Sequence, residues 1–231
     1  MTQMKDHQGE EGFVEFRDPD AREIAESAHW QFFEQRMRMR RSMRHFSSDP
    51  VPISLVRKAV ELATTAPSGA NKQPWTFCIV GEAGLKRQIR EAAEAEEYKN
   101  YHGRMSEDWL EDLRPFGTDH HKAFLEDAPY LIAIFKQLYG ESNAGSGGRQ
   151  KHYYVNESLG IATGILISAL QMCGLCSLTH TPSPMNFLEK ILERPENERA
   201  YLLIPTGWPH PSAKVPNIGK KPVHKMVYEY L

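Results

Sequence analysis

Cysteine is scarce in this chain, which contains three among 231 residues. So few cysteines, in an odd number, exclude a disulfide-stapled scaffold and are typical of a reducing compartment. An excess of charge of one sign is also missing, because 28 lysines and arginines face 30 aspartates and glutamates. That balance excludes nucleic acid as the main partner, since binding a polyanion needs a basic excess. The polar first residues contain no apolar leader segment, so we expect a cytoplasmic protein.

Charged side chains are absent from one long segment, since residues 158–188 contain no Asp, Glu, Lys or Arg. The stretch 159–176 within it is just long enough to span a membrane. It contains three glycines and several polar side chains, however, and lacks aromatic and basic anchors on its far side. We therefore expect no membrane segment but a helix buried in the core or in a dimer interface. Gly160 and Gly164 would let another helix or a ligand approach its backbone closely.

The length suits one domain, and alternating strand and helix patterns indicate an α/β or α+β class. Apolar periodicity predicts helices over 53–66, 82–101 and 159–176, with a further surface helix ending near 113. It predicts strands over 75–80, 130–138, 175–179 and 199–207. A first helix should start after Asp18-Pro19 and end near 38, and Ser183-Pro184 should cap a short one. Residues 140–148 read as a flexible connection, and the tail from 208 as extended chain.

Three motifs that could indicate a redox site, a phosphate-binding loop or a metal site lack the context or spacing that each of these sites requires. Cys173 and Cys176 form C-x-x-C at the end of an apolar helix, whereas a redox site needs the motif at a helix start. The glycine-rich stretch 145–151 lacks the spacing of a phosphate-binding loop. Its neighbour His152 and the pair at 120–121 have no regular ligand spacing, so we expect no metal site.

Two segments are more informative. Arg40, Arg41, Ser42 and Arg44 offer guanidinium forks and a hydroxyl within five residues, a set that matches phosphate oxygens. The alternative is a solvated basic helix end that interacts with the helix dipole. The loop 67–70 is either a simple turn or a place where backbone amides meet a planar ligand.

Together these segments resemble the nitroreductase superfamily of flavin enzymes, and most closely its iodotyrosine deiodinase branch. The resemblance is carried by Arg40-Arg41-Ser42-Met43-Arg44, Ala66-Pro67-Ser68-Gly69-Ala70, Pro74-Trp75-Thr76-Phe77 and Thr179-His180-Thr181-Pro182. It implies an α+β fold with a mixed central sheet flanked by helices, in an intertwined homodimer that binds FMN at two interface sites. The domain would cover 1–231, with an N-terminal arm (1–35), a mobile active-site lid (91–117) and an extended C-terminal tail (208–231).

The resemblance also assigns the cofactor site. Arg40, Arg41, Ser42, Arg44 and Lys220 would hold the FMN phosphate and ring edge. Pro67, Ser68 and Gly69 would lie against the isoalloxazine, and Thr179, His180 and Thr181 would line its other side. Two positions depart from the branch: Lys220 stands where an arginine is usual, which keeps the charge but loses the fork, and His180 stands where a threonine is expected.

For the substrate, the resemblance implies a clamp of Glu97, Tyr101 and Lys122, with the Ala70 amide on the phenolate. Glu97 and Tyr101 are four residues apart on one helix face. The carboxylate would take the ammonium of an amino acid, and the phenol and lysine its carboxylate. Glu94 and Tyr98 offer the same spacing one turn earlier. Without the resemblance, all of these side chains read as ordinary surface charges.

The implied activity is FMN-dependent reductive dehalogenation of halotyrosines, with Thr181 near flavin N5 and Ala70 as the catalytic groups. Electrons would come from NAD(P)H or a reductase. One alternative is a general NAD(P)H-dependent nitroreductase or quinone reductase on the same scaffold. A second is a flavin- or amino-acid-binding protein without turnover, because fold alone does not fix function.

Overall fold

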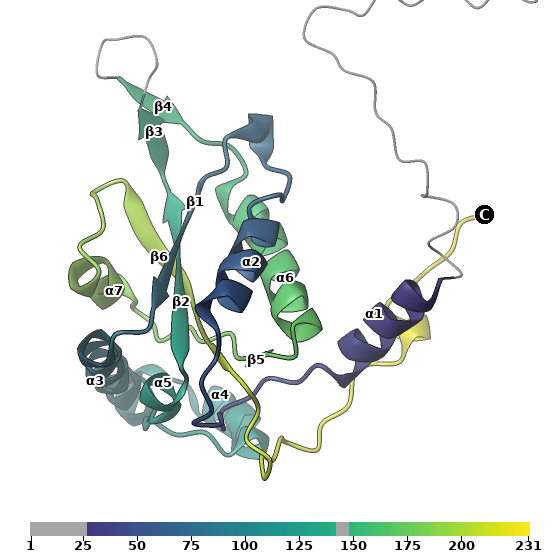
Figure 1. Cartoon of the computed structure of the whole chain (residues 1–231). Coiled ribbons are helices and arrows are strands. Elements are labelled where there is room, and N and C mark those ends of the chain that lie inside the picture. The colour runs from purple at the N-terminus through teal and green to yellow at the C-terminus, as the bar shows by residue number, and fades with distance from the viewer. Residues whose placement is uncertain (1–26, 142–147) are drawn as a thin grey trace, which may run out of the picture. The chain divides into compact units, whose positions relative to one another are not determined.

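The computed structural model describes residues 27–141 and 148–231 (Figure 1). The chain divides into a unit of residues 1–39 and a main unit of residues 40–231. In the first unit, α1 (Ala28–Met39) is a helix on which the rings of Trp30 and Phe33 stack with centroids 5.8 Å apart. The predicted start of this helix near Asp18 lies outside the described residues.

The main unit is built on a four-stranded sheet in the order β1-β2-β6-β5. The strands are β1 (Trp75–Val80), β2 (Tyr130–Gln137), β5 (Cys176–Ser177) and β6 (Glu198–Gly207). All neighbouring strands pair antiparallel. Side chains alternate along β2, so Ile132 and Ile134 enter one core while Leu131, Ala133 and Phe135 enter the other. A strand buried on both faces has a nearly continuous apolar sequence, which is why β2 is easily predicted.

Helices cover both faces of this sheet (Figure 1), which confirms the α+β class. One layer contains α2 (Ile53–Ala63) and α6 (Val155–Met172). The other contains α3 (Ala83–Lys99), α5 (Phe124–Asp127) and α7 (Asn186–Ile191). The mixed sheet implied by the resemblance is antiparallel in its named strands. Within the described part of the chain, parallel pairing is limited to an isolated bridge between Ser42 and Ser177.

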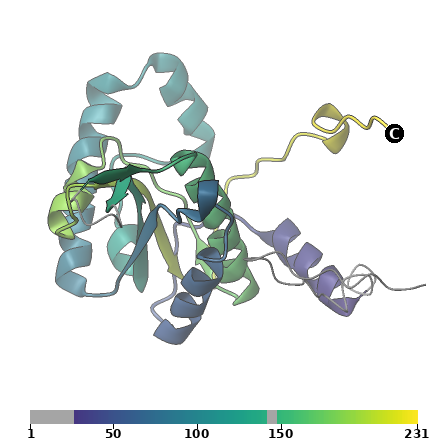
Figure 2. The same ribbon diagram turned by 90° about the horizontal axis from the view of Figure 1, so that it is seen from above.

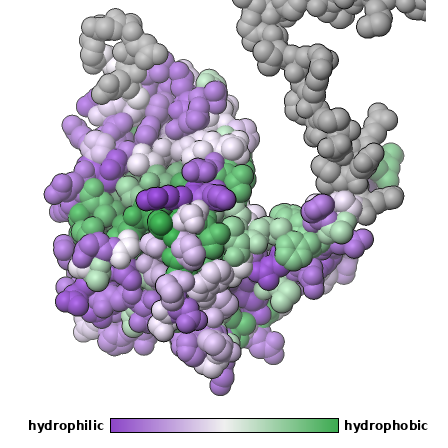
Figure 3. Space-filling model, viewed as in Figure 1, coloured by the Kyte–Doolittle hydropathy of each residue, from purple (hydrophilic) through white to green (hydrophobic). Residues whose placement is uncertain are grey.

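The uncharged segment forms α6, as predicted, and packs against α2 and the sheet. Ile161 on its outer side is nonetheless 47 % exposed, and a Cβ added at Gly164 would meet open space. Figure 3 shows hydrophobic surface in this part of the molecule. In residues 27–141 and 148–231, no helix combines the length and apolarity needed to cross a membrane. The helix therefore belongs to the core, with one apolar side left at the surface.

Several element ends differ from the sequence prediction. α3 is capped by the Glu82 carboxylate, which accepts from the Gly84 amide at 2.7 Å, and it continues past Lys99 as a π-helical turn, η3 (Asn100–Arg104). The expected connection at 140–148 includes a hairpin of β3 (Tyr139–Glu141) and β4 (Arg149–Lys151). The strand expected over 175–179 shortens to β5. α7 begins at Asn186, so Ser183-Pro184 is not its cap. These features depend on tertiary neighbours rather than on local propensity.

The lid segment (residues 91–117) comprises the second half of α3, then η3, α4 and η4. α4 is Glu107–Leu113, with the Ser106 hydroxyl as its N-cap, and η4 is Arg114–Phe116. Two further short helices lie elsewhere, η2 (Gly69–Asn71) and η5 (Val223–Lys225). Figure 2 shows the lid helices standing beside the sheet rather than over its centre. The lid can therefore wall a cavity at the sheet edge.

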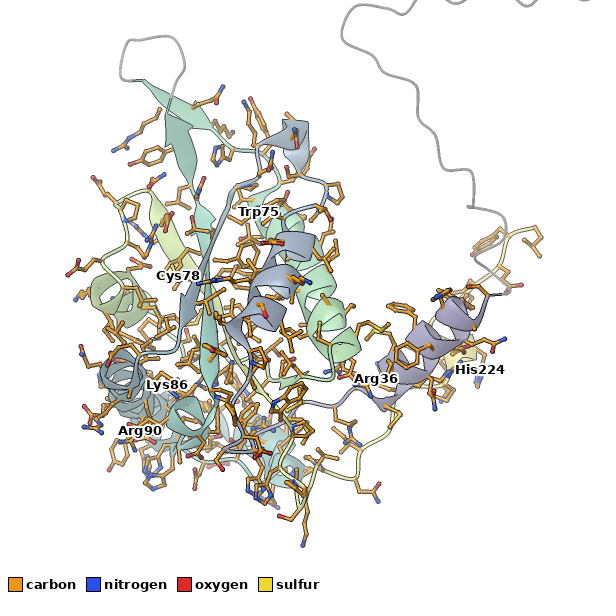
Figure 4. All side chains as sticks on the ribbon, viewed as in Figure 1. Arg36, Trp75, Cys78, Lys86, Arg90 and His224 are labelled. Carbon is orange, nitrogen blue, oxygen red and sulfur yellow. The ribbon has the colours of Figure 1, made fainter. Side chains whose placement is uncertain are left out.

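Lys86 anchors the base of this segment (Figure 4). Its buried ammonium donates to the carbonyls of Glu126 and Ala128, both at 2.7 Å, which terminates α5 against α3. Burial lowers the pKa of Lys86. Arg90, one turn on, pairs with the Glu126 carboxylate at 2.9 Å. These contacts fix the chain that leads from Lys122 into α5.

Replacing Lys86 with methionine should destabilise the protein by about 2 kcal/mol, because two buried carbonyls lose their donor. Arg87→Met is the matched control, since the Arg87 side chain is 65 % exposed and forms only a long ion pair with Glu126, at 3.7 Å. It should cost less than about 0.5 kcal/mol. Urea unfolding followed by circular dichroism measures both. Equal losses would show that Lys86 contributes no more than a surface charge.

Candidate functional site

A first cavity of about 210 Å³ opens at the end of the sheet where Ser42 bridges to Ser177. We call it the basic cavity. It is lined by Arg40, Arg41, Ser42, Arg44, Phe116, Leu178, Thr179, Pro216, Ile218, Gly219 and Lys220. The Arg41 guanidinium donates to the Pro216 carbonyl, so the proximal tail is held against the arginine cluster. The structure thus brings together residues more than 170 positions apart.

The donor set of the basic cavity fits an anion. Three guanidinium groups, one ammonium and two hydroxyls line it, and its lining residues include no carboxylate. Forked guanidinium groups bind phosphate oxygens bidentately. Burial lowers the pKa of Arg44, the innermost of the three, which still remains charged at neutral pH. The alternative of a solvated helix end does not fit, because α1 ends at Met39 and the cluster follows in extended chain.

A second cavity of about 250 Å³ shares Arg44, Leu178 and Thr179 with the first. We call it the clamp cavity. It is lined in addition by Glu97, Tyr101, Met105, Trp109, Leu113, Thr118, Lys122, Phe124, His180 and Thr181. All three predicted clamp residues therefore lie in one cavity beside the basic cluster. Glu97 lies on α3, Tyr101 on η3 and Lys122 in the loop before α5.

A buried ion pair lines the clamp cavity. The Lys122 ammonium is 3.3 Å from the Glu97 carboxylate, and the two side chains are 3 % and 9 % exposed. The ammonium also donates to the Asp119 carbonyl and lies 5.4 Å from the centre of the Tyr101 ring. Burial lowers the pKa of Lys122 and raises that of Tyr101. One anion, one cation and a neutral phenol can complement a ligand that carries both an ammonium and a carboxylate.

The alternative pair one turn earlier is not in the cavity. Glu94 instead accepts from the Lys122 backbone amide at 2.7 Å, and so holds the lysine from behind. Tyr98 is 52 % exposed, and its ring stacks on His102 with centroids 4.0 Å apart. The helical spacing allowed either pair, but the geometry places only Glu97 and Tyr101 at the site.

Thr179, His180 and Thr181 follow the alternation of extended chain. The two threonines are exposed at the cavities and His180 between them is buried. The His180 amide and carbonyl bond to Leu203 of β6 at 2.8 and 3.0 Å, which fixes the direction of its side chain. Its ring meets Phe124 edge to face. Burial, followed by the charges of Lys122 and Arg44, lowers the pKa of His180 to about 3, so the imidazole is neutral.

The loop 67–70 lies apart from both cavities, since none of its residues lines either one. Ala70 has left-handed backbone angles (φ 50°, ψ 32°), an uncommon conformation for a residue with a side chain. Gly69 packs so tightly that an added Cβ would be 2.7 Å from the Tyr153 carbonyl oxygen. Such constrained, strained loops concentrate at binding sites. A single chain therefore forms the predicted phosphate cluster and the predicted clamp, but its loop 67–70 lies outside both cavities.

Sequence reasoning named the lid only as a segment and missed the side chains that wall the cavities. Met105, Trp109 and Leu113 line the clamp cavity, and Phe116 lines the basic cavity. Trp109 and Leu113 are four residues apart on α4, so they share a face. Two large apolar residues at this spacing in an otherwise charged helix were the sequence feature that could have predicted a cavity-facing side of α4.

Comparison with known proteins identifies the family. The Nitroreductase family profile matches residues 37–208, which include the basic cluster, the loop 67–70, the clamp and the extended segment 179–181. This chain belongs to the nitroreductase family. A BluB-like flavoprotein from Clostridium difficile shares the fold, with a TM-score of 0.63 at 20 % identity over 86 % of this chain and 98 % of that one.

More similar relatives of this nitroreductase-family chain are named iodotyrosine deiodinases. One from Haliscomenobacter hydrossis is 52 % identical over 86 % of this chain and 87 % of its own length. One from Drosophila melanogaster is 49 % identical over 80 % of this chain, which spans 65 % of that protein. A crystal structure of oxidized iodotyrosine deiodinase bound to FMN and 3-iodo-L-tyrosine matches with a TM-score of 0.71 at 29 % identity. It covers 86 % of this chain and 98 % of that one.

The buried ion pair predicts that Lys122 contributes more to stability than an exposed lysine that forms an ion pair on the surface of α3. Lys122→Met should destabilise the ligand-free protein by about 3 kcal/mol, because it leaves the Glu97 charge buried without a partner. Adding Glu97→Gln should recover most of that loss. Lys99→Met is the control, since Lys99 pairs with Glu96 at 2.7 Å but is 53 % exposed, and it should cost less than about 1 kcal/mol. Urea unfolding of these three variants and of the wild type measures this, and a double variant no more stable than Lys122→Met would contradict it.

Proposed function

We propose that this protein is an FMN-dependent reductive dehalogenase of halotyrosines. The proposal is carried by one observation: a phosphate-type cavity adjoins a cavity that contains Glu97, Tyr101 and Lys122. It is supported by relatives at 49–52 % identity that are named iodotyrosine deiodinases, and by the likeness to a structure that contains FMN and 3-iodo-L-tyrosine. Family membership alone does not determine the reaction. The clamp residues favour a substrate that carries both an ammonium and a carboxylate.

The residues present fit FMN. Its phosphate would take the forks of Arg40 and Arg41, the Ser42 hydroxyl and the Lys220 ammonium in the basic cavity. Arg44 and Thr179 line both cavities, so they would contact the ring system between phosphate and substrate. Arg41 would exchange its Pro216 carbonyl for a phosphate oxygen. Lys220 contributes charge without bidentate geometry.

A second copy of the chain would complete the site. Pro67, Ser68, Gly69 and Ala70 line neither the basic cavity nor the clamp cavity, although the family resemblance assigns them to the cofactor and the substrate. The exposed Ile161 and the open space at Gly164 give α6 a side that a partner helix can approach closely. We propose a homodimer in which the loop 67–70 of each copy faces the other copy's basic cluster. We propose in addition that residues 91–117 act as a mobile active-site lid and that residues 1–35 form an N-terminal arm.

A halotyrosine would bind through both its ends. Glu97 would accept from its ammonium, while Lys122 and Tyr101 would donate to its carboxylate, so the zwitterion would insert into the existing ion pair. Met105, Trp109 and Leu113 of the lid would exclude water from the aromatic ring. The backbone amide of Ala70 would bond the phenolate oxygen and favour the keto tautomer, in which the carbon–halogen bond is weaker.

The reaction replaces a carbon–halogen bond by a carbon–hydrogen bond and releases halide, which consumes two electrons and one proton. Reduced FMN would supply the electrons, replenished by NAD(P)H or a reductase. The Thr181 hydroxyl would hold a proton at ring atom N5, which favours single-electron steps over hydride transfer. The free state of all three cysteines supports a cytoplasmic, reducing location.

The deciding experiment is anaerobic. Dithionite-reduced protein mixed with 3-iodotyrosine should release iodide and tyrosine, whereas Thr181→Ala should bind both ligands but deiodinate at least tenfold more slowly while keeping nitroaromatic reduction. Flavin reoxidation and product chromatography measure both reactions. Iodotyrosine binding without iodide release would support a binding protein. Turnover of nitroaromatics alone, unaffected by Thr181→Ala, would support a general nitroreductase or quinone reductase.

The purified protein should be a yellow dimer, and Arg41→Ala should bind FMN at least 100-fold more weakly. The reason is that a charge-assisted bidentate contact to phosphate contributes about 3 kcal/mol. Arg57→Ala, an exposed arginine on α2, is the control and should retain FMN. Fluorescence titration of the apoprotein measures affinity, and sedimentation measures mass. Equal FMN affinity in the two variants would remove the phosphate assignment.

A further inference from the structure

His180 carries an unsatisfied polar atom at the clamp cavity. The residue is 9 % exposed, and its Nε2 is fully enclosed with no hydrogen-bond partner among the described residues. A buried donor or acceptor without a partner costs about 1–3 kcal/mol, so its retention needs an explanation. The proposed function gives His180 no role beyond lining the site, and the resemblance leads one to expect threonine there.

The enclosure of Nε2 selects the tautomer. An enclosed nitrogen without a partner is less costly as a lone pair than as an N–H, because orphaned N–H groups are the rarer case in folded proteins. The ring proton therefore resides on Nδ1. Because Nε2 has no accessible surface, Nδ1 is the ring nitrogen that is left to donate to a ligand in the cavity. The neutral ring thus presents one donor and no charge.

The surroundings of the ring identify what that donor meets. Lys122 and Arg44 line the clamp cavity together with His180, and their charges lower its pKa, so the ring lies at the end of the cavity that carries these two cations. In the proposed binding mode that end receives the substrate's carboxylate. The protons of Lys122 already have protein acceptors in Glu97, Thr118 and Asp119. An additional donor that adds no third positive charge would therefore be useful there.

We infer that His180 is a specificity-determining residue that donates an uncharged ring N–H to the carboxylate of an α-amino acid ligand. This inference rests on the proposed function. It predicts that the residue separates amino acids from the corresponding amines, which have the same phenol and ammonium but no carboxylate. The main-chain bonds to Leu203 hold the ring in place for this contact.

The test compares two ligands on three proteins, each loaded with FMN. The ligands are 3-iodotyrosine and 3-iodotyramine, which lacks the carboxylate, and quenching of flavin fluorescence gives their affinities. His180→Leu, of similar volume, should weaken iodotyrosine roughly tenfold or more and iodotyramine less than about twofold. His180→Asn places an amide N–H near the position of Nδ1 and should restore most of the loss. Equal weakening of both ligands, or no weakening, would overturn the inference.

A second measurement uses the wild-type protein and does not depend on how the variants fold. Arg44, Glu97, Tyr101 and Lys122 are the charged and titratable groups that line the cavity with His180. Because its imidazole is neutral above a pKa of about 3, the ratio of the two affinities should stay constant from pH 7.5 to 5.5. A ratio that favours iodotyrosine more strongly as the pH falls would indicate a charged imidazolium and overturn the uncharged donor. Failure of the wild type to bind iodotyrosine at all would instead overturn the proposed function itself.

Discussion

The contact between Glu97 and Lys122 is the interaction on which the rest of the site depends. Two opposite charges are held 3.3 Å apart, almost without solvent, and neither can be buried alone at acceptable cost. Keeping them together requires that α3 and the loop before α5 stay in register. The structure secures this with Lys86 on the α5 carbonyls and with Glu94 on the Lys122 amide. The pair thus links the position of the lid to the electrostatics of the cavity.

The two cavities differ in the charge of their lining residues. The basic cavity is lined by three guanidinium groups and one ammonium without a carboxylate and suits a permanent dianion, whereas the clamp cavity is internally balanced and suits a zwitterion. Arg44 and Thr179 lie between them, so a ligand in one cavity lies beside a ligand in the other. The alternation along 179–181 turns two hydroxyls outward and one imidazole inward, and β6 fixes that pattern through Leu203. A single stretch of extended chain thereby serves both cavities.

The loop 67–70 shows why a single chain is an incomplete enzyme under this proposal. It is tightly packed, with Gly69 against Tyr153 and left-handed angles at Ala70, yet it lines neither the basic cavity nor the clamp cavity. Strain of this kind is stabilised by its surroundings and is normally tied to function. α6 begins two residues after Tyr153, the residue that Gly69 contacts, and it retains an apolar outer side at Ile161. The proposed homodimer would account for the tightly packed loop and the apolar side together.

The sequence alone determined β1, β2, β6 and α6, because long uninterrupted apolar runs leave few alternatives once they are buried on one or both faces. The local patterns at 40–44 and 66–70, read with the resemblance, pointed to the family, since short motifs survive where distant parts of a sequence diverge. Sequence could not choose between Glu97 with Tyr101 and Glu94 with Tyr98, because a helix repeats every 3.6 residues and both pairs share a face. Only the packing of α3 on α5, which turns one pair toward Lys122, made that choice. The same holds for the π-helical turn after Lys99, the hairpin at β3 and β4, and the burial of His180: each depends on neighbours distant in sequence, which no local pattern encodes.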